Sequence, residues 1–144
     1  MRSERAITKF IEGYSCAQAV LFCFCDEVGM SEDDALKLAC GFGAGMARKQ
    51  EVCGAVTGGI IVIGARHGRG KNDGPEAREL TYAKTRELME RFAERHGTYV
   101  CRDLLKGCDL ATPEGQKAFG DKDLLEKVCK PCVRSVVEIL EDIV

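Results

Sequence analysis

The stretch Ala39–Gly64, ACGFGAGMARKQEVCGAVTGGIIVIG, decides how the rest of this chain folds. It holds two of the nine cysteines, seven of the sixteen glycines and the most apolar run in the sequence. Cys53 follows a basic turn at Arg48 and Lys49 and opens the segment CGAVTGG, where small residues let other backbone come close. A thiol held in that setting predicts a functional site.

Residues 53–66 combine the patterns of a strand and of a helix. The run VTGGIIVIG has the β-branched content of a buried strand, and its glycines weaken a helix. No other segment of the chain offers a convincing partner strand. We therefore interpret these residues as a buried helix, in which Gly54, Ala55 and Gly58 permit close packing against a neighbour.

The composition indicates one folded domain over residues 1–144. Hydrophobic residues make up 45% of the sequence, which is enough for a full core and argues against disorder. The net charge is −2 and both signs are mixed along the chain, so no basic face predicts nucleic-acid binding.

The sequence carries no signal for a membrane or for secretion. The N-terminus MRSERAITKF lacks the apolar region of a signal peptide, and the apolar run at 60–63 is too short and glycine-broken to cross a bilayer. We therefore expect a cytoplasmic protein that binds no membrane. In that compartment nine cysteines, an odd number, indicate metal or redox chemistry rather than a disulfide framework.

Periodicity and capping signals predict helices in the first quarter of the chain. A short amphipathic helix covers residues 3–11. A central helix opens at Ser15, whose capping-box partner Gln18 makes Cys16 the first helical residue. A third helix opens at Ser31.

The later part of the chain predicts further helices. Pro75 begins a long helix that ends at His96 before Gly97, Thr112 begins a short one, and the apolar repeat over 133–143 marks the last. The inward sides of the third and the long helix are expected to carry apolar residues, among them Ala35, Leu38, Ala39, Leu80, Leu88 and Phe92. The sequence thus predicts an all-α, compact single-domain bundle of about five to seven helices.

Four of the nine cysteines lie at or near predicted helix starts, namely Cys16, Cys53, Cys101 and Cys129. The first turn of a helix presents backbone N–H groups and positive potential, which favour a thiolate as nucleophile or metal ligand. Four such ends could meet in a compact bundle. We therefore expect these four cysteines to form one site.

The other cysteines have simpler explanations. Cys23 and Cys25 point to roughly opposite sides of a helix and are expected to be small buried hydrophobes. Cys40 is expected on the inward face of its helix, and Cys108 could be a second thiol near Cys101.

The sharpest local motif is Cys129-Lys-Pro-Cys132 near the start of the last helix. It resembles the thioredoxin active site, where the helix dipole stabilises the attacking and leaving thiolates. A thioredoxin-like site needs a preceding strand in a βαβ unit, which this sequence lacks. No second C-x-x-C completes a four-cysteine zinc knuckle. Taken alone, the motif does not identify a function.

Four segments resemble, in the same order, the family of redox-active C_GCAxxG_C_C proteins. They are GYSCAQAVL at 13–21, GFGAGMARKQEVCGAVTGG at 41–59, CRDLLKGCDLATPEG at 101–115 and VCKPCVRSVVEIL at 128–140. Together they span nearly the whole chain. The combination is specific, whereas CGAVTGG alone would not be.

The resemblance implies that the four cysteines that give the family its name fall on Cys16, Cys53, Cys101 and Cys129. Cys132 could substitute for Cys129, and Cys108 could also replace a member of this quartet. The family is similar to the non-haem domain of the split-Soret cytochromes, for which a [2Fe–2S] centre has been proposed. The haem part does not carry over, because no CxxCH motif is present.

Two redox hypotheses follow. In the first, the quartet binds a [2Fe–2S] cluster for electron transfer or redox sensing; zinc would use the same ligands, but their scattered spacing disfavours it. In the second, the chain is a metal-free thiol–disulfide oxidoreductase, in which two quartet members, or Cys129 with Cys132, cycle between dithiol and disulfide. A structural helical module with incidental buried cysteines is the third interpretation.

The remaining expectations concern class and partners. No general base, nucleophile–histidine pair or carboxylate dyad predicts a hydrolase, so oxidoreductase is the enzyme class we expect if the chain is an enzyme. We expect a redox partner protein. The apolar second helix and the glycine-rich helix leave room for a homodimer without requiring one.

Overall fold

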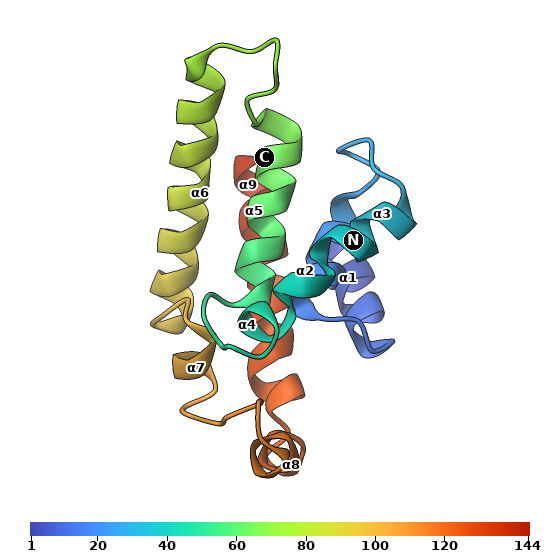
Figure 1. The fold of residues 1–144 in the computed structure, drawn as a ribbon, viewed down its shortest axis with the longest axis vertical. Coiled ribbons are helices and arrows are strands. Elements are labelled where there is room, and N and C mark those ends of the chain that lie inside the picture. Colours follow the sequence, from blue (N-terminus) through green and yellow to red (C-terminus); the bar gives the residue numbers. More distant parts are fainter.

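Two helices, α2 (Cys16–Phe24) and α5 (Gly54–His67), pack against each other at the centre of the computed structural model, which describes residues 1–144 (Figure 1). Helix α1 (Arg2–Ile11) and α3 (Glu32–Ala39) cover α2 on one side. The long α6 (Pro75–His96) and the C-terminal α9 (Lys130–Ile143) run beside α5. The core therefore lies between α2, α5 and α9.

Shorter elements connect these helices. They are the 3₁₀ turn η1 (Cys40–Phe42), α4 (Gly43–Met46), α7 (Cys101–Leu104), α8 (Pro113–Asp121) and the π-helical turn η2 (Leu125–Cys129). The all-α prediction is confirmed. The structure has more helices than the expected five to seven, because single-turn segments such as α4 and α7 are too short to produce a periodic pattern in the sequence.

The predicted helix boundaries are confirmed where capping residues mark them. Ser15 and Gln18 form the reciprocal capping box at the start of α2. Ser31 accepts from the Asp34 N–H at the start of α3. Gly97, with φ of +86°, ends α6 in the left-handed conformation that glycine tolerates.

The glycine-rich stretch after Cys53 is the buried helix α5, as predicted. Its first turns lie directly on α2: a Cβ at Gly58 would stand 2.7 Å from the Ala17 carbonyl oxygen. Its other side faces α6 and α9, because a Cβ at Gly59 would meet Leu88 and Val136 at 2.9 Å. Glycine is required here for contact, since a larger residue would push the helices apart.

Three predicted inward positions are wrong. Leu38 is 58% exposed, Leu80 is 45% exposed and Cys40 is exposed. Helix α3 is short and buries only Ala35 and Ala39, which lie one turn apart on a narrow face. Helix α6 has only two fully buried residues, so most of its apolar residues lie outside the core.

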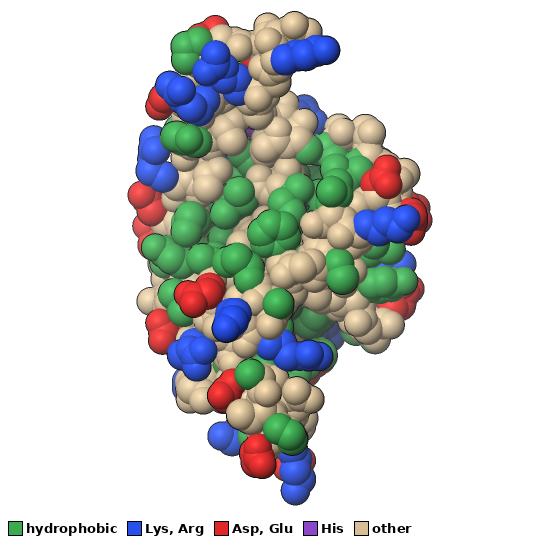
Figure 2. Space-filling model, in the orientation of Figure 1, with side chains coloured by type: hydrophobic (Ala, Val, Ile, Leu, Met, Phe, Trp, Pro, Cys, Tyr) green, Lys and Arg blue, Asp and Glu red, His purple; other side chains and the backbone are tan.

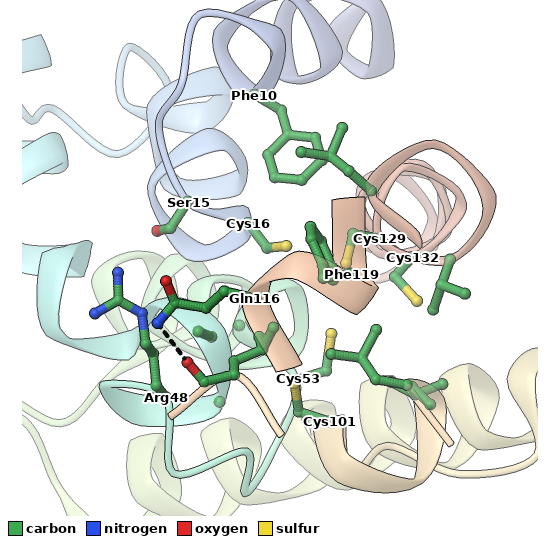
Figure 3. A pocket seen from close by; sticks show the side chains of 18 of the residues that line it. Phe10, Ser15, Cys16, Arg48, Cys53, Cys101, Gln116, Phe119, Cys129 and Cys132 are labelled. Atoms are coloured by element: carbon green, nitrogen blue, oxygen red, sulfur yellow. Dashed lines mark hydrogen bonds between the residues drawn. The ribbon is translucent and has the colours of Figure 1, made fainter. Parts of the chain in front are cut away.

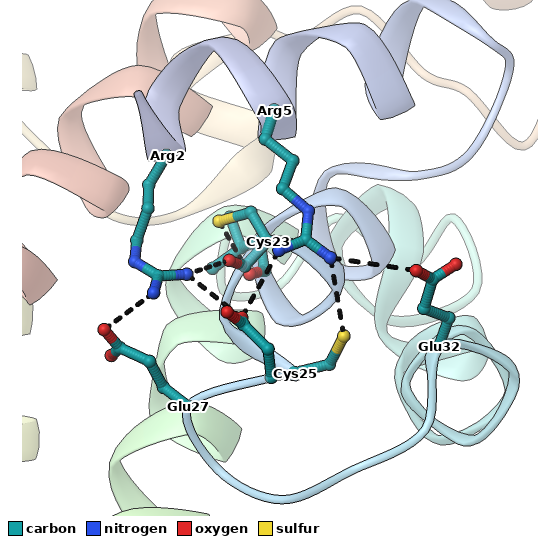
Figure 4. A network of polar contacts seen from close by, with 8 residues as sticks. Arg2, Arg5, Cys23, Cys25, Glu27 and Glu32 are labelled. Carbon is teal, nitrogen blue, oxygen red and sulfur yellow. Dashed lines mark hydrogen bonds and ion pairs between the residues drawn. The ribbon is translucent and has the colours of Figure 1, made fainter.

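Arginines of α1 hold the end of α2 in place (Figure 4). Arg2 pairs with Glu27 at 2.7 Å and also donates to the Cys23 carbonyl oxygen. Arg5 reaches the Cys25 sulfur at 3.9 Å. The thiols of Cys23 and Cys25 are buried in this region, which confirms the expectation that they are packing residues.

Hydrophobic side chains gather over the middle of one face, and charged side chains lie mainly toward its ends and edges (Figure 2). The homodimer stays a prediction, and this apolar area is the surface at which its contact would be tested. None of the helices combines the length and the apolar character that crossing a membrane requires.

Replacing Gly58 by alanine is expected to destabilise the protein by about 1–3 kcal/mol, because the added Cβ overlaps the α2 backbone. Gly64→Ala is the matched control in the same helix. Its Cβ meets nothing within 4 Å, so better helix propensity should stabilise the protein by up to about 1 kcal/mol. Urea unfolding followed by circular dichroism measures both changes, and effects of equal sign would contradict the α2–α5 contact.

Candidate functional site

Five cysteines line a single cavity of about 380 Å³ beside the ends of α2, α5, α7 and α9 (Figure 3). They are Cys16, Cys53, Cys101, Cys129 and Cys132. The cavity thus contains all four members of the predicted quartet and one more. The rest of the lining is mostly apolar and includes Phe10, Leu105, Phe119 and Val128.

The first turns of α2 and α5 meet at this cavity because Gly54 has no side chain. A Cβ at Gly54 would stand 3.3 Å from the Ala17 nitrogen and 3.4 Å from the Cys16 Cβ. Cys16 is the first residue of α2 and Cys53 caps α5. The small residues after Cys53 therefore bring two helix starts, each with a cysteine, side by side.

An isolated antiparallel bridge between Val52 and Val100 adds the third cysteine. The Cys53 N–H donates to the Tyr99 carbonyl at 2.8 Å, and the Cys101 N–H donates to the Glu51 carbonyl at 2.6 Å. The bridge places Cys101 next to Cys53 although 48 positions separate them in sequence (101 minus 53). A single bridged pair gives no alternating pattern, so the sequence carries no signal for it.

Buried Gln50 connects this bridge to the following loop. Its Nε2 donates to the Cys108 carbonyl at 2.7 Å, and its Oε1 accepts from the Leu110 N–H at 2.8 Å. The amide of Gln50 therefore provides hydrogen-bond partners for two backbone groups of a loop that lies outside any helix or sheet. This holds residues 108–110 against the cavity, where Leu110 is part of the lining.

The CKPC segment supplies two cysteines, Cys129 from the end of η2 and Cys132 from α9. Residues Leu125–Cys129 wind as a π-helix that runs directly into α9, so Cys129 lies inside a helical stretch rather than at a free helix start. Pro131 lacks the N–H that a regular α-helix would use there, which explains the wider winding before it. Cys132 follows one turn later and points into the same cavity.

The five thiols include two neighbouring pairs. Cys16 lies beside Cys129, and Cys132 lies beside Cys53. Cys129 and Cys132 thus face different partners on different helices. The sequence predicted Cys132 only as a dithiol partner of Cys129 or as its substitute. Its place beside Cys53 depends on how α9 lies against α5, which the sequence does not show.

The environment ionises Cys53 in preference to its partner. The hydrogen bond from Cys132 and the N–H groups of Ala55 and Val56 lower the pKa of Cys53, although burial acts against this. The same contact, together with burial, raises the pKa of Cys132. The bond to Cys129 and burial likewise raise the pKa of Cys16. Cys53 is therefore the thiolate of its pair.

Cys101, the fifth cysteine of the cavity, differs from Cys53 in its ionisation. Burial raises its pKa to about 12, with the neighbouring Cys53 and Cys129 acting in the same direction. Cys101 is therefore a neutral thiol that lines the cavity at neutral pH. It forms no hydrogen bond with another of the five thiols.

A left-handed turn forms the edge of the cavity. Residues 44–48 all have positive φ, between +53° and +69°, although only Gly45 among them is a glycine. A Cβ at Gly45 would stand 2.5 Å from the Gln50 Cα, so the turn folds tightly onto the bridge. It presents Arg48, the only charged residue of the cavity lining. Backbone of this kind is costly and is concentrated at functional sites.

The thiols of the cavity are the side chains that would hold a metal here. No group of three or more His, Cys, Asp or Glu side chains stands at the spacing that would hold a metal ion, so a single ion does not fit these side chains as they lie. A [2Fe–2S] cluster takes two ligands at each iron.

The remaining cysteines lie outside the cavity. Cys108, which could have joined the quartet, donates from its sulfur to the Gly115 carbonyl at 3.1 Å. Cys40 is exposed on the surface, and Cys23 and Cys25 belong to the contact between α1 and α2. Cys40 is therefore a suitable control for thiol experiments.

The fold and the cavity define a class of protein: a helical bundle whose helix ends bring a cluster of thiols together. Residues 14–143 match the family model described as "Putative redox-active protein (C_GCAxxG_C_C)", and this chain belongs to that family. Neither the comparison with curated proteins nor the comparison with solved structures finds a match.

Replacing Ala47 by glycine is expected to stabilise the protein by about 1 kcal/mol, because glycine adopts positive φ without the steric cost that alanine pays. Ala83→Gly in the exposed part of α6 is the matched control and should destabilise by about 1 kcal/mol. Thermal unfolding of both variants measures the difference. Destabilisation by both substitutions would contradict the left-handed turn.

Proposed function

We propose that this chain is a thiol–disulfide redox protein whose reacting pair is Cys53 and Cys132. The observation that carries the proposal is the place of the Cys132 thiol beside the Cys53 sulfur in the cavity. Thiols in such contact need little movement to form a disulfide. The CKPC motif then contributes Cys132 to a pair with α5 and does not act as a thioredoxin-like dithiol.

Cys53 is the nucleophile in this proposal. Its thiolate attacks one sulfur of a substrate disulfide, and the other sulfur leaves as a thiolate that takes up a proton. Cys132 then gives up its proton and attacks the Cys53 sulfur, which releases the second substrate thiol. The substrate gains two electrons from the Cys53–Cys132 pair and two protons, one from Cys132 and one from water. A dithiol reductant restores the pair.

The pKa shifts match these two roles. Cys53 is activated as the attacking thiolate by donors that its partner and α5 supply. The pKa of Cys132 is raised mainly by its contact with Cys53. That contact is lost once Cys53 carries a mixed disulfide, so Cys132 becomes easier to ionise at the moment when it must attack.

The cavity indicates the substrate class. Its volume of about 380 Å³ suits a small molecule, and its lining is mostly apolar. Arg48 stands at its edge as the one charged group. The proposal is therefore a small disulfide with an apolar body and an anionic group that reaches Arg48.

Oxidation of the reduced chain with one equivalent of diamide is expected to give a Cys53–Cys132 disulfide, mapped by peptide mass spectrometry. Cys53→Ser and Cys132→Ser should each abolish this disulfide and the reduction of small disulfides, at least 100-fold for Cys53→Ser because the nucleophile is lost. Cys40→Ser is the control and should change neither. A disulfide between Cys129 and Cys132 as the first product would contradict the proposal.

The pH dependence of Cys53 alkylation tests the contact with Cys132. Because the pKa of Cys53 is lowered, its reaction with iodoacetamide should reach half of its maximal rate at a pH below the pKa of an ordinary cysteine thiol. Cys132→Ala removes the largest stabilising donor, so the midpoint should move to higher pH and the rate at pH 7 should fall. An unchanged midpoint would exclude Cys132 as that donor.

A [2Fe–2S] cluster is the second candidate, and the arrangement of the thiols in two pairs favours it. Cys16 and Cys129 would hold one iron, and Cys53 and Cys132 the other; the cluster would supply one-electron transfer. Reconstitution with iron and sulfide tests this candidate. Visible absorption should then be lost in Cys132→Ser and kept in Cys101→Ser. The predicted quartet, which contains Cys101 and lacks Cys132, would give the opposite result. Absorption that survives Cys132→Ser would contradict this ligand set.

A further inference from the structure

The pair formed by Cys16 and Cys129 has no role in the reaction proposed for Cys53 and Cys132. Its two thiols lie beside each other in the same cavity, as those of the first pair do. It comes from different elements, the start of α2 and the end of the π-helical turn before α9. The fold thus brings two thiols from positions 113 residues apart (129 minus 16) into one cavity.

The two pairs differ in their access to solvent. Cys53 is 6% exposed and Cys132 is 1% exposed, so the first pair is nearly closed off. Cys16 and Cys129 are both partly exposed as whole residues, although the Cys16 sulfur itself is desolvated. We name Cys53 and Cys132 the inner pair, and Cys16 and Cys129 the outer pair.

Helix α9 connects the two pairs. Cys129 and Cys132 are three residues apart and lie on the same side of the helical stretch, so each pair has one member on that side (Figure 3). Both side chains face the same cavity. Cys129 is therefore positioned to reach a disulfide that contains Cys132.

We propose that Cys16 and Cys129 form a second dithiol, which exchanges with the inner pair through attack of Cys129 on Cys132. The inference rests on the proposed function, since the inner disulfide is its starting point. It adds a second two-electron couple, so that the cavity holds four reacting thiols. Cys101 is not one of them.

The exchange balances without an added oxidant. The Cys129 thiolate attacks the Cys132 sulfur of the inner disulfide, and Cys53 leaves as a thiolate that the α5 N–H groups stabilise. Cys16 then attacks Cys129 and releases Cys132. Two electrons move from the outer pair to the inner pair. The protons of the Cys16 and Cys129 thiols are replaced by protons on Cys53 and Cys132.

In this arrangement the inner pair and the outer pair react with different molecules. A small disulfide reaches the inner pair through the cavity. A dithiol reductant that is too large to enter the cavity reaches the outer pair at Cys129, which is partly exposed. The exchange then carries electrons from that reductant to the buried pair.

A time course with one equivalent of diamide tests the exchange in the wild-type chain. Samples are quenched with acid, alkylated and mapped by peptide mass spectrometry. We expect the Cys53–Cys132 disulfide to appear first and the Cys16–Cys129 disulfide to grow as the first decays. With excess diamide, both disulfides should form and four of the nine thiols should be lost.

Two variants make the test specific. Cys16→Ser should trap the Cys129–Cys132 disulfide, because the thiol that resolves it is missing. Cys129→Ser should leave Cys16 reduced while the Cys53–Cys132 disulfide still forms. Cys40→Ser should behave as wild type, and circular dichroism checks that each variant folds.

The outcomes separate the two proposals. If the inner disulfide forms while Cys16 and Cys129 remain reduced, the exchange is overturned and the proposed function stands. The exchange is also overturned if Cys16→Ser gives no Cys129–Cys132 disulfide in a folded chain. If no Cys53–Cys132 disulfide forms in the wild type, the proposed function fails and the exchange fails with it.

Discussion

The close contact between the first turns of α2 and α5 is the constraint on which the rest of the structure depends. Gly54 and Gly58 lie against the backbone at Ala17, so the two helix starts approach as nearly as main chains can. Cys16 and Cys53 occupy those starts and come together for that reason. A larger side chain at either glycine would separate the helices and open the thiol cluster at the same time.

The left-handed turn at the edge of the cavity has an unfavourable backbone conformation, which raises the free energy of the folded state locally. Ala44, Met46, Ala47 and Arg48 each stand at positive φ, at about 1–2 kcal/mol per residue. The hydrogen bonds of Gln50 and the packing of the turn onto the bridge offset part of this cost. The result is a rigid edge that carries one positive charge beside an apolar, thiol-lined cavity.

Local signals in the sequence predicted much of the fold and most of the site. The capping box at Ser15 and the glycines after Cys53 specify their helices whatever surrounds them, so these predictions are confirmed. Leu38 was misplaced because its helix buries too narrow a face. The role of Cys132 and the bridge at Val52 depend on contacts between distant segments, which no single stretch of sequence encodes.

The measurement that tests the central claim most directly is the iron and sulfide content of the chain purified without oxygen, together with its visible spectrum. The account of two adjacent thiol pairs that react as dithiols predicts a colourless, iron-free protein with nine alkylatable cysteines after reduction. Stoichiometric iron and sulfide, with visible absorption that disappears in Cys53→Ser, would contradict it and establish the cluster as the working form of the site.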